Sequence, residues 1–130
     1  MFNYYVDRTI RSGPAMTESV HAVIAARLGQ PEEAYRRFRQ SVDPFVRPPF
    51  FSFSEKRTRD NLQFLTGAAG SLQAVLYGFA GLRMEDSPMP VFHPQLPAAW
   101  SGLVLRNLSW RGKRYDVVVR RGQPVRLIAR

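Results

Sequence analysis

The chain has 130 residues, which is enough for one ordinary domain or two small subdomains with thin cores. It contains no cysteine, so disulfide bonds and thiolate metal sites are excluded. Its net charge of +9 is concentrated near the end, where residues 101–130 hold eight Arg or Lys against Asp116 alone. Such a face can attract a polyanion, but no nucleic-acid motif accompanies it, and we expect a solvated sheet surface with no specific nucleic-acid partner.

Membrane insertion and metal chemistry are not expected. The residues after Met1 form no basic-then-apolar leader, and the longest apolar run, residues 74–80, is too short to span a bilayer. We therefore expect a soluble chain in the cytoplasm. His21 and His93 are far apart and no suitably spaced acidic cluster accompanies them. We therefore predict neither a metal site nor a cofactor.

Two amphipathic helices are predicted before residue 45. The first is capped by Thr17 and ends at Gly29, and its apolar residues recur at helical spacing. The second has Pro31 at a first helical position and ends near Asp43. The expected buried stripes are Val20, Val23, Ile24 and Leu28 in the first helix and Tyr35, Phe38 and Val42 in the second, with Arg36, Arg37 and Arg39 mostly on the solvent side.

Residues 44–66 are expected to form a long irregular loop. They show no sustained periodicity, and Pro48 and Pro49 forbid regular strand pairing. Long loops in compact domains are usually either functional or disordered. Disorder is disfavoured here because aromatic side chains are costly to leave in water, and this loop carries Phe45, Phe50, Phe51 and Phe53. We expect it to fold back over the start of the next helix and to place Glu55 in or beside a concavity lined by Phe51, Phe53 and Phe64.

That third helix is predicted to be capped by Thr66 and ended by Gly81. It is apolar on nearly all sides, which is typical of a helix buried among neighbours. Glycines cost stability in a helix, so their number suggests close approach of another backbone. The expected stripe is Leu72, Val75, Leu76 and Phe79, and the glycines are Gly67, Gly70, Gly78 and Gly81.

After a linker at residues 85–90, the pattern changes to the alternation of antiparallel strands, with Gly112 and Gly122 where hairpin turns are needed. The inward positions are expected to include Leu103, Leu105, Leu108, Trp110, Tyr115, Val117, Val119, Val125 and Leu127. The predicted fold class is α+β. It comprises a helical region at residues 1–84 and a small antiparallel β-meander subdomain at residues 85–130.

Glu55 is the best single candidate for a catalytic carboxylate. It follows an aromatic, proline-constrained loop and leads into an apolar helix, a setting that can desolvate a carboxylate. From residue type alone, the plainer interpretation is favoured, in which Glu55 is an exposed acid paired loosely with a neighbouring Lys or Arg. Asp60 is the rival carboxylate, in a charged tract. Ser52 and Ser54 have no nearby His, so a serine-hydrolase triad finds no support.

An ordered series of phrases extends from about Tyr4 to the C-terminus. It consists of residues 13–17 (Gly-Pro-Ala-Met-Thr), 53–55 (Phe-Ser-Glu), 64–67 (Phe-Leu-Thr-Gly) and 72–83. Together they resemble glycoside hydrolase family 65, in particular its acid-trehalase-like and glucosylgalactosyl-hydroxylysine-glucosidase-like branch. The resemblance covers only the C-terminal portion of much longer family chains.

The resemblance implies the last helices of an (α/α)6 barrel, followed by the small β-rich C-terminal domain of that family. It implies an inverting hydrolase of an α-linked glucoside in which Glu55 is the general base that activates water. The general acid would lie upstream, so the isolated chain is expected to be inactive and to need the remainder of the barrel as its partner. Candidate substrate-binding residues are Asn61 and Gln63, whose amides can bond sugar hydroxyls, and Thr66 and Gly67 at a helix N-terminus.

Two alternatives stay open at this point. One is a disaccharide phosphorylase fragment of the same family, where this helix N-terminus resembles a phosphate cradle with a His and a Ser. Phe64 and Gly67 stand in those places here, which favours hydrolysis. The other is a non-catalytic binding module that uses its basic sheet on polyanions. Neither the choice among trehalose, kojibiose and glucosyl-galactose nor an oligomeric state follows from the sequence.

Overall fold

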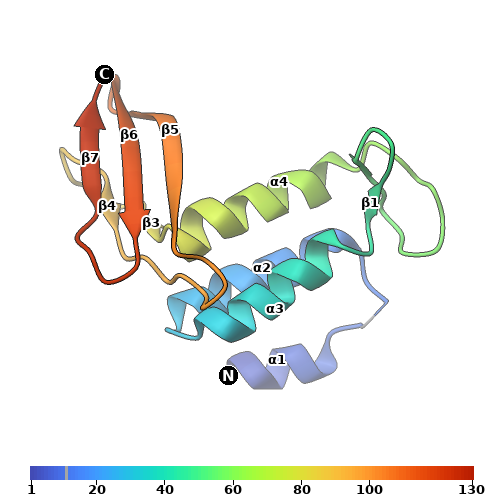
Figure 1. Ribbon diagram of the computed structural model, residues 1–130. Helices are drawn as coiled ribbons and strands as arrows, with labels where there is room; N and C mark the ends of the chain where they lie inside the picture. The colour runs from blue at the N-terminus through green and yellow to red at the C-terminus, as the bar shows by residue number, and fades with distance from the viewer. Residues whose placement is uncertain (11) are drawn as a thin grey trace.

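The computed structural model describes residues 1–10 and 12–130 and shows a helical region beside small antiparallel sheets (Figure 1). Its helices are α1 (Phe2–Arg8), α2 (Ala15–Arg27), α3 (Pro31–Val42) and α4 (Leu65–Gln73), the last continued by a π-helical segment, η1 (Ala74–Phe79). Its strands are β1 (Val46–Arg47), β2 (Ser52–Phe53), β3 (Leu82–Arg83), β4 (Val91–Phe92), β5 (Gly102–Trp110), β6 (Lys113–Arg120) and β7 (Arg126–Ala129). The α+β class is confirmed. That its helices belong to an (α/α)6 barrel stays a prediction.

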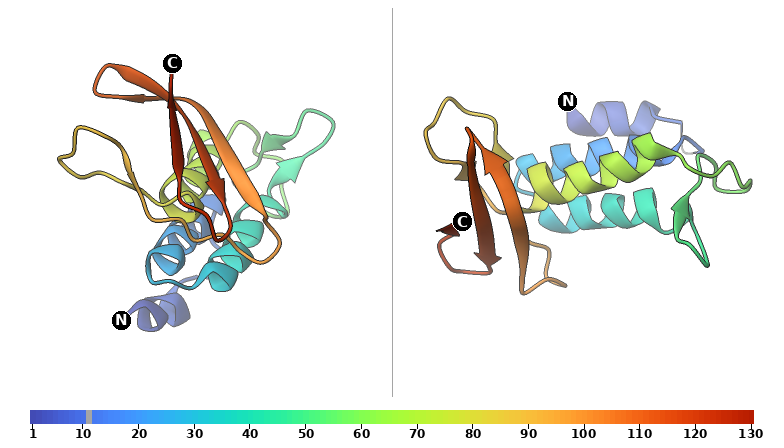
Figure 2. Two further views of the ribbon diagram at one scale, coloured as in Figure 1. Left: turned by 60° about the vertical axis from the view of Figure 1, so that its left-hand side comes forward. Right: turned by 90° about the horizontal axis from the view of Figure 1, so that it is seen from above.

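Helices α2, α3 and α4 run side by side, with the short α1 against their outer side (Figures 1 and 2). Small residues line the contacts between them. A Cβ added to Gly67 would lie 2.9 Å from the Ala15 side chain, and one added to Gly70 would collide with the Ser19 hydroxyl. A larger side chain at either position would force the helices apart. The predicted close approach of another backbone is confirmed at Gly81, where an added Cβ would collide with the His93 carbonyl.

The predicted buried stripe of α2 is wrong. Val20, Ile24 and Leu28 are 54%, 39% and 55% exposed. The buried face consists mostly of small side chains, because α3 and α4 approach too closely for large ones: Ala15, Ser19, His21, Ala22, Ala25 and Ala26. Thr17 is not the cap. The helix begins at Ala15 after Pro14, without a side-chain capping bond.

Helix α3 begins at Pro31 and ends at Val42, as its sequence predicts. Arg36 and Arg39 are exposed, as expected, but the side chain of Arg37 is only 12% exposed. The prediction for Arg37 is wrong because Glu18 of α2 faces it and forms an ion pair with it at 3.0 Å. A charge with such a partner can be buried at a position that helical periodicity alone assigns to solvent.

Helix α4 begins two residues earlier than predicted, so Thr66 lies inside it and Phe64 takes the N-cap position without a side-chain bond. The helix is not buried on all sides, since Leu72 is 71% exposed. Gly81 follows the helix with φ +74°, which confirms its predicted role as the end of the helix. Its Cα lies so close to the backbone carbonyl of His93 that no side chain fits there.

The β-meander is confirmed as a three-stranded antiparallel sheet in the order β5-β6-β7. Gly112 and Gly122 have φ values of +77° and +68° in its two turns, where a left-handed backbone is required. The inner face buries Tyr115, Val117 and Val119, packed by partly buried residues that include Leu103, Leu105, Leu108, Trp110, Val125 and Leu127. A register shift between Leu105 and Leu108 lets both leucines join this core.

Aromatic side chains connect the helical region to the sheet. Phe79 is fully buried at the end of η1, and its ring centroid lies 4.7 Å from that of Trp100, just before β5. Tyr35 and Phe38 of α3 also pack edge-on against Trp100. Between Phe79 and Trp100 the chain forms the β3–β4 hairpin, whose loop contains residues 85–90. In the described ranges 1–10 and 12–130, no helix is long and apolar enough to cross a membrane.

Candidate functional site

The loop from Pro44 to Thr66 contains regular pairing, contrary to the sequence-based expectation. Strands β1 and β2 form a short hairpin in which Val46 pairs with Phe53 and Arg47 with Ser52. Pro48 and Pro49 lie in the turn of this hairpin, where no ladder hydrogen bond is required of them. The prolines therefore limit the length of the strands without preventing their formation.

Residues 61–64 then return alongside the end of β2 and pair with residues 53–55. Ser54 pairs with Leu62, Glu55 N–H donates to the Asn61 carbonyl at 3.0 Å, and Phe64 N–H donates to the Phe53 carbonyl at 3.0 Å. Because Phe64 is also the N-cap of α4, these bonds fasten the loop to the start of that helix. The predicted fold-back over the third helix is confirmed.

Ser54 organises the turn that carries the charged residues, and sequence reasoning missed this role. It is fully buried, and its hydroxyl oxygen lies 2.6 Å from the Arg59 carbonyl and accepts a bond from Asn61 N–H at 3.1 Å. Arg47 supports the same turn by donating to the carbonyls of Lys56 and Arg57 at 3.0 and 2.8 Å. Strand alternation could have indicated this role, because in an extended segment the side chain of Ser54 points to the face opposite those of Phe53 and Glu55.

Glu55 is half-buried at the entrance to this turn. Asn61, one of the predicted substrate-binding residues, donates its side-chain amide to Glu55 Oε2 at 2.5 Å. Across the described part of the chain, Glu55 forms no ion pair, so the plainer interpretation of an acid paired with a neighbouring base does not describe this geometry. The rival Asp60 is the carboxylate that is neutralised, since Arg47 Nε donates to it at 2.8 Å.

A concavity of about 380 Å³ lies beside this strand pair, at the start of α4. The three predicted aromatic residues line it together with four others: Phe51, Ser52, Phe53, Gln63, Phe64, Leu65 and Ala68. Of the predicted site residues, Gln63 is part of this lining. Glu55, Asn61, Thr66 and Gly67 are not. The concavity and the Glu55–Asn61 pair are joined through neighbouring residues of the same two chain segments.

Thr66 and Gly67 occupy the first turn of α4. Thr66 is exposed, and Gly67 is buried against Ala15 and Phe64. The Gly67 N–H donates to the Phe64 carbonyl at 3.2 Å, and the Ala68 N–H donates to the same carbonyl at 3.3 Å. Two amides of this helix terminus are therefore already occupied by the chain itself.

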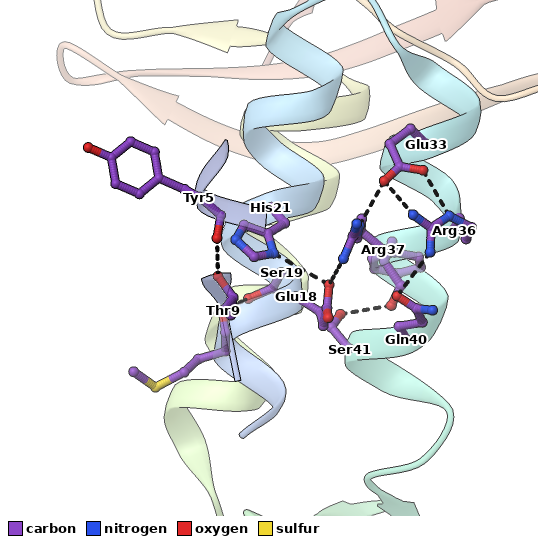
Figure 3. A network of polar contacts seen from close by, with 12 residues as sticks. Tyr5, Thr9, Glu18, Ser19, His21, Glu33, Arg36, Arg37, Gln40 and Ser41 are labelled. Carbon is purple, nitrogen blue, oxygen red and sulfur yellow. Dashed lines mark hydrogen bonds and ion pairs between the residues drawn. The ribbon is translucent and has the colours of Figure 1, made fainter. Parts of the chain in front are cut away.

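A second polar group lies between α2 and α3 (Figure 3). Arg37 bridges the helices, donating to Glu18 at 3.0 Å and to Glu33 at 2.8 Å, while Arg36 Nε donates to Glu33 at 2.8 Å. Burial opposes ionisation of Glu33, but the hydrogen bonds and charges of Arg36 and Arg37 outweigh it and hold its pKa below the usual range. Glu18, Arg36 and Arg37 line a cavity of about 340 Å³ together with residues of α1. Their charges are paired within the group, so the group fastens α3 to α2.

No group of three or more His, Cys, Asp or Glu within residues 1–10 and 12–130 is arranged to hold a metal ion. His21 is buried on α2 with Nδ1 3.5 Å from Glu18 Oε2, and His93 is exposed beside the β3–β4 hairpin.

Comparison with known proteins shows which family this sequence resembles. Residues 82–125 match the sequence model of the glycosyl hydrolase family 65 C-terminal domain. The chain is 33% identical over 114 residues to protein-glucosylgalactosylhydroxylysine glucosidase of Dictyostelium discoideum and 31% identical over 115 residues to kojibiose hydrolase of Mucilaginibacter mallensis, each match covering 88% of this chain. These matches show that the chain is similar to glycosyl hydrolase family 65, with the C-terminal domain of that family at residues 82–125.

A third family 65 relative, the periplasmic/secreted acid trehalase of Candida glabrata, is 33% identical over 138 aligned residues that cover 89% of this chain. The chain spans 16%, 17% and 11% of the lengths of these three relatives. Matches of this extent must include the loop at residues 44–66, whereas the domain match at residues 82–125 covers the sheet region alone. Because this trehalase is named as periplasmic or secreted, the cytoplasmic location expected for the present chain stays a prediction.

Proposed function

We propose that this chain is the C-terminal portion of an inverting α-glucoside hydrolase and that Glu55 is its general base. The observation that carries the proposal is the bond from the Asn61 amide to Glu55 Oε2 at 2.5 Å. A neutral amide donor orients a carboxylate without cancelling its charge. The base therefore keeps the capacity to accept a proton, which an ion pair with Lys56 or Arg57 would reduce.

In this mechanism, Glu55 takes a proton from a water molecule as that water attacks the anomeric carbon. The bond to the leaving oxygen breaks on the opposite face, and a second carboxylic acid protonates that oxygen. Inverting enzymes keep the two carboxyl groups about 6.5–9.5 Å apart so that the water fits between base and sugar. The acid is supplied by the part of the barrel that precedes these residues in family sequences.

The substrate class follows from the named activities of the relatives, which act on glucosylgalactosylhydroxylysine, kojibiose and trehalose. We assign an α-linked glucoside to this chain. Phosphorolysis is less well supported, because the Gly67 N–H that would face a phosphate already donates to the Phe64 carbonyl. A rival polyanion function of the basic sheet region is less well supported, since Arg111 pairs with Asp86 and Arg130 with Asp116.

The remainder of the barrel is the proposed partner of the helical region. Met16, Val20, Ile24 and Leu28 follow one another at four-residue spacing along α2 and are all exposed. A groove of about 250 Å³ runs beside them between α2 and α4. Apolar side chains gain stability when they are covered. The matched residues make up only 16%, 17% and 11% of three relatives, so the remaining length of a complete family protein can supply the helices that cover this stripe.

The test is Glu55→Gln in the complete hydrolase that contains these residues. Since a general base acts mainly in the transition state, we expect kcat on trehalose or kojibiose to fall by roughly 10²–10⁴ with little change in KM. Asp60→Asn is the matched control and should keep near-normal kcat. NMR of the first product should show β-glucose. Near-normal kcat in Glu55→Gln, or turnover by the isolated chain, would contradict the proposal.

A further inference from the structure

The aromatic concavity has two backbone features that a general base does not explain. Phe51 has φ +54° and Gln63 has φ +63°, and both line the concavity. Left-handed backbone at residues other than glycine is strained and persists where the surroundings enforce it, which is often at ligand sites. Phe51 is also 70% exposed, so this conformation holds a large ring out toward solvent.

The surroundings of the two residues are built to hold this shape. Ser52, next to Phe51, pairs with Arg47 in the hairpin, and the Phe64 N–H next to Gln63 donates to the Phe53 carbonyl. Gly67 makes room for the rings beneath, because a Cβ there would lie 2.9 Å from the Phe64 ring and 3.3 Å from the Phe53 ring. The concavity is therefore a shaped feature of the loop and of the start of α4.

The concavity and the base lie on the same strand pair. Phe53 and Glu55 are two residues apart in an extended segment, which places their side chains on one side about 6.5 Å apart along the strand. Asn61 and Gln63 flank Leu62, the residue of the facing segment that pairs with Ser54. A ligand seated against Phe53 and Gln63 therefore reaches toward Glu55 and Asn61.

We propose that this concavity is a subsite for one pyranose ring of the α-glucoside, with Phe51 covering one sugar face and the Gln63 amide bonding the hydroxyls. This rests on the proposed function. A pyranose has apolar C–H faces and a rim of hydroxyls, so it fits an aromatic hollow that contains one amide. The volume of about 380 Å³ falls within the range of about 300–1,000 Å³ typical of small-molecule sites.

The experiment uses three variants of the complete hydrolase. Phe51→Ala should raise KM for trehalose or kojibiose about tenfold with kcat little changed, because the ring buries apolar surface on substrate and product alike. Phe51→Tyr keeps the ring and should restore KM to within about twofold of the unmodified enzyme. Phe50→Ala is the matched control, since Phe50 is the adjacent residue, is 87% exposed and does not line the concavity. Its KM should not change.

Binding of D-glucose, measured by calorimetry, gives a readout that does not require turnover. Glucose binding should weaken in Phe51→Ala and persist in Glu55→Gln. The experiment therefore distinguishes failure of the subsite proposal from failure of the general-base proposal. If Phe51→Ala leaves KM and glucose binding unchanged while lowering Tm, another part of the protein fills the concavity and the proposal is overturned. An equal rise of KM in Phe50→Ala and Phe51→Ala would also overturn it.

Discussion

The helices and the three-stranded sheet bury opposite kinds of side chain. On α2, the buried face is mostly alanine and serine, and large apolar side chains such as Val20 and Leu28 are exposed. On β6, Tyr115, Val117 and Val119 are buried, while Arg114 and Arg120 are exposed. The sheet thus encloses its own large side chains, whereas α2 uses small ones to approach its neighbours and leaves its large ones outward.

This difference is the one expected if the sheet covers its own large apolar side chains and α2 needs further helices to cover its own. Covering a large apolar side chain contributes about 1.5–3 kcal/mol. The sheet obtains that contribution from its own strands and from the residues just before β5. The outward stripe of α2, formed by Met16, Val20, Ile24 and Leu28, does not obtain this contribution. This is the behaviour expected of a helix that belongs to a larger helical assembly.

The largest effect on stability should come from removing the aromatic contact between Phe79 and Trp100, which joins the helical region to the sheet. Phe79→Ala empties a fully buried position against Trp100 and should lower the free energy of unfolding by about 3–5 kcal/mol. Leu72→Ala on the same helix is the control and should change it little, because Leu72 is exposed. Urea unfolding followed by circular dichroism measures both. Equal losses would mean that the outer face of α4 is also covered.

A smaller effect is expected where the helical region passes into the β3–β4 hairpin. Gly81→Ala and Gly29→Ala both place a Cβ on a backbone with φ +74°, but only at Gly81 does it meet another residue, the His93 carbonyl. Gly29→Ala should cost about 1–2 kcal/mol from backbone strain alone. Gly81→Ala should cost roughly 2–4 kcal/mol, since overpacking is added. The difference in Tm between the two variants measures the steric cost of the contact with the His93 carbonyl. Equal Tm values would contradict the close approach of Gly81 to His93.

Asp116 makes a pH-dependent contribution to the stability of the sheet. The hydrogen bond from Arg130, followed by the one from the Asn107 N–H, lowers the pKa of Asp116. Its contribution is therefore present above the ordinary Asp pKa of about 3.9 and is lost as the pH falls through the lowered value. Asp116→Asn should be less stable at pH 7 and should lose less Tm between pH 5 and about 2. The exposed Asp86→Asn should behave like the unmodified chain; the same behaviour in Asp116→Asn would contradict this reading.

The smallest effect should come from the outward stripe of α2. Ile24→Gln in the isolated chain should change the free energy of unfolding by no more than about 0.5 kcal/mol, because the side chain already contacts water. Ala25→Gln next to it should be strongly destabilising, since Ala25 is fully buried. In the complete protein Ile24→Gln should lower Tm. No loss there would show that this stripe is not covered by the rest of the barrel.

The candidate site was only partly predictable from the sequence. Glu55, the fold-back of the loop and the three aromatic rings followed from composition, proline placement and the family resemblance. The bond between Glu55 and Asn61 did not follow, because it depends on two segments pairing across a turn that Ser54 and Arg47 hold from inside. Thr66 was expected to cap α4, but the pairing of Phe64 with Phe53 starts the helix earlier.

What the sequence determined by itself was whatever a local rule encodes. The alternation of β5 to β7, the left-handed glycines in the turns and the start of α3 at Pro31 each depend on residues within a few positions of one another. Only the tertiary structure decided which face of α2 is buried and why Arg37 is enclosed. Both depend on how closely a neighbouring helix approaches and on the charge it presents, and helical periodicity carries neither quantity.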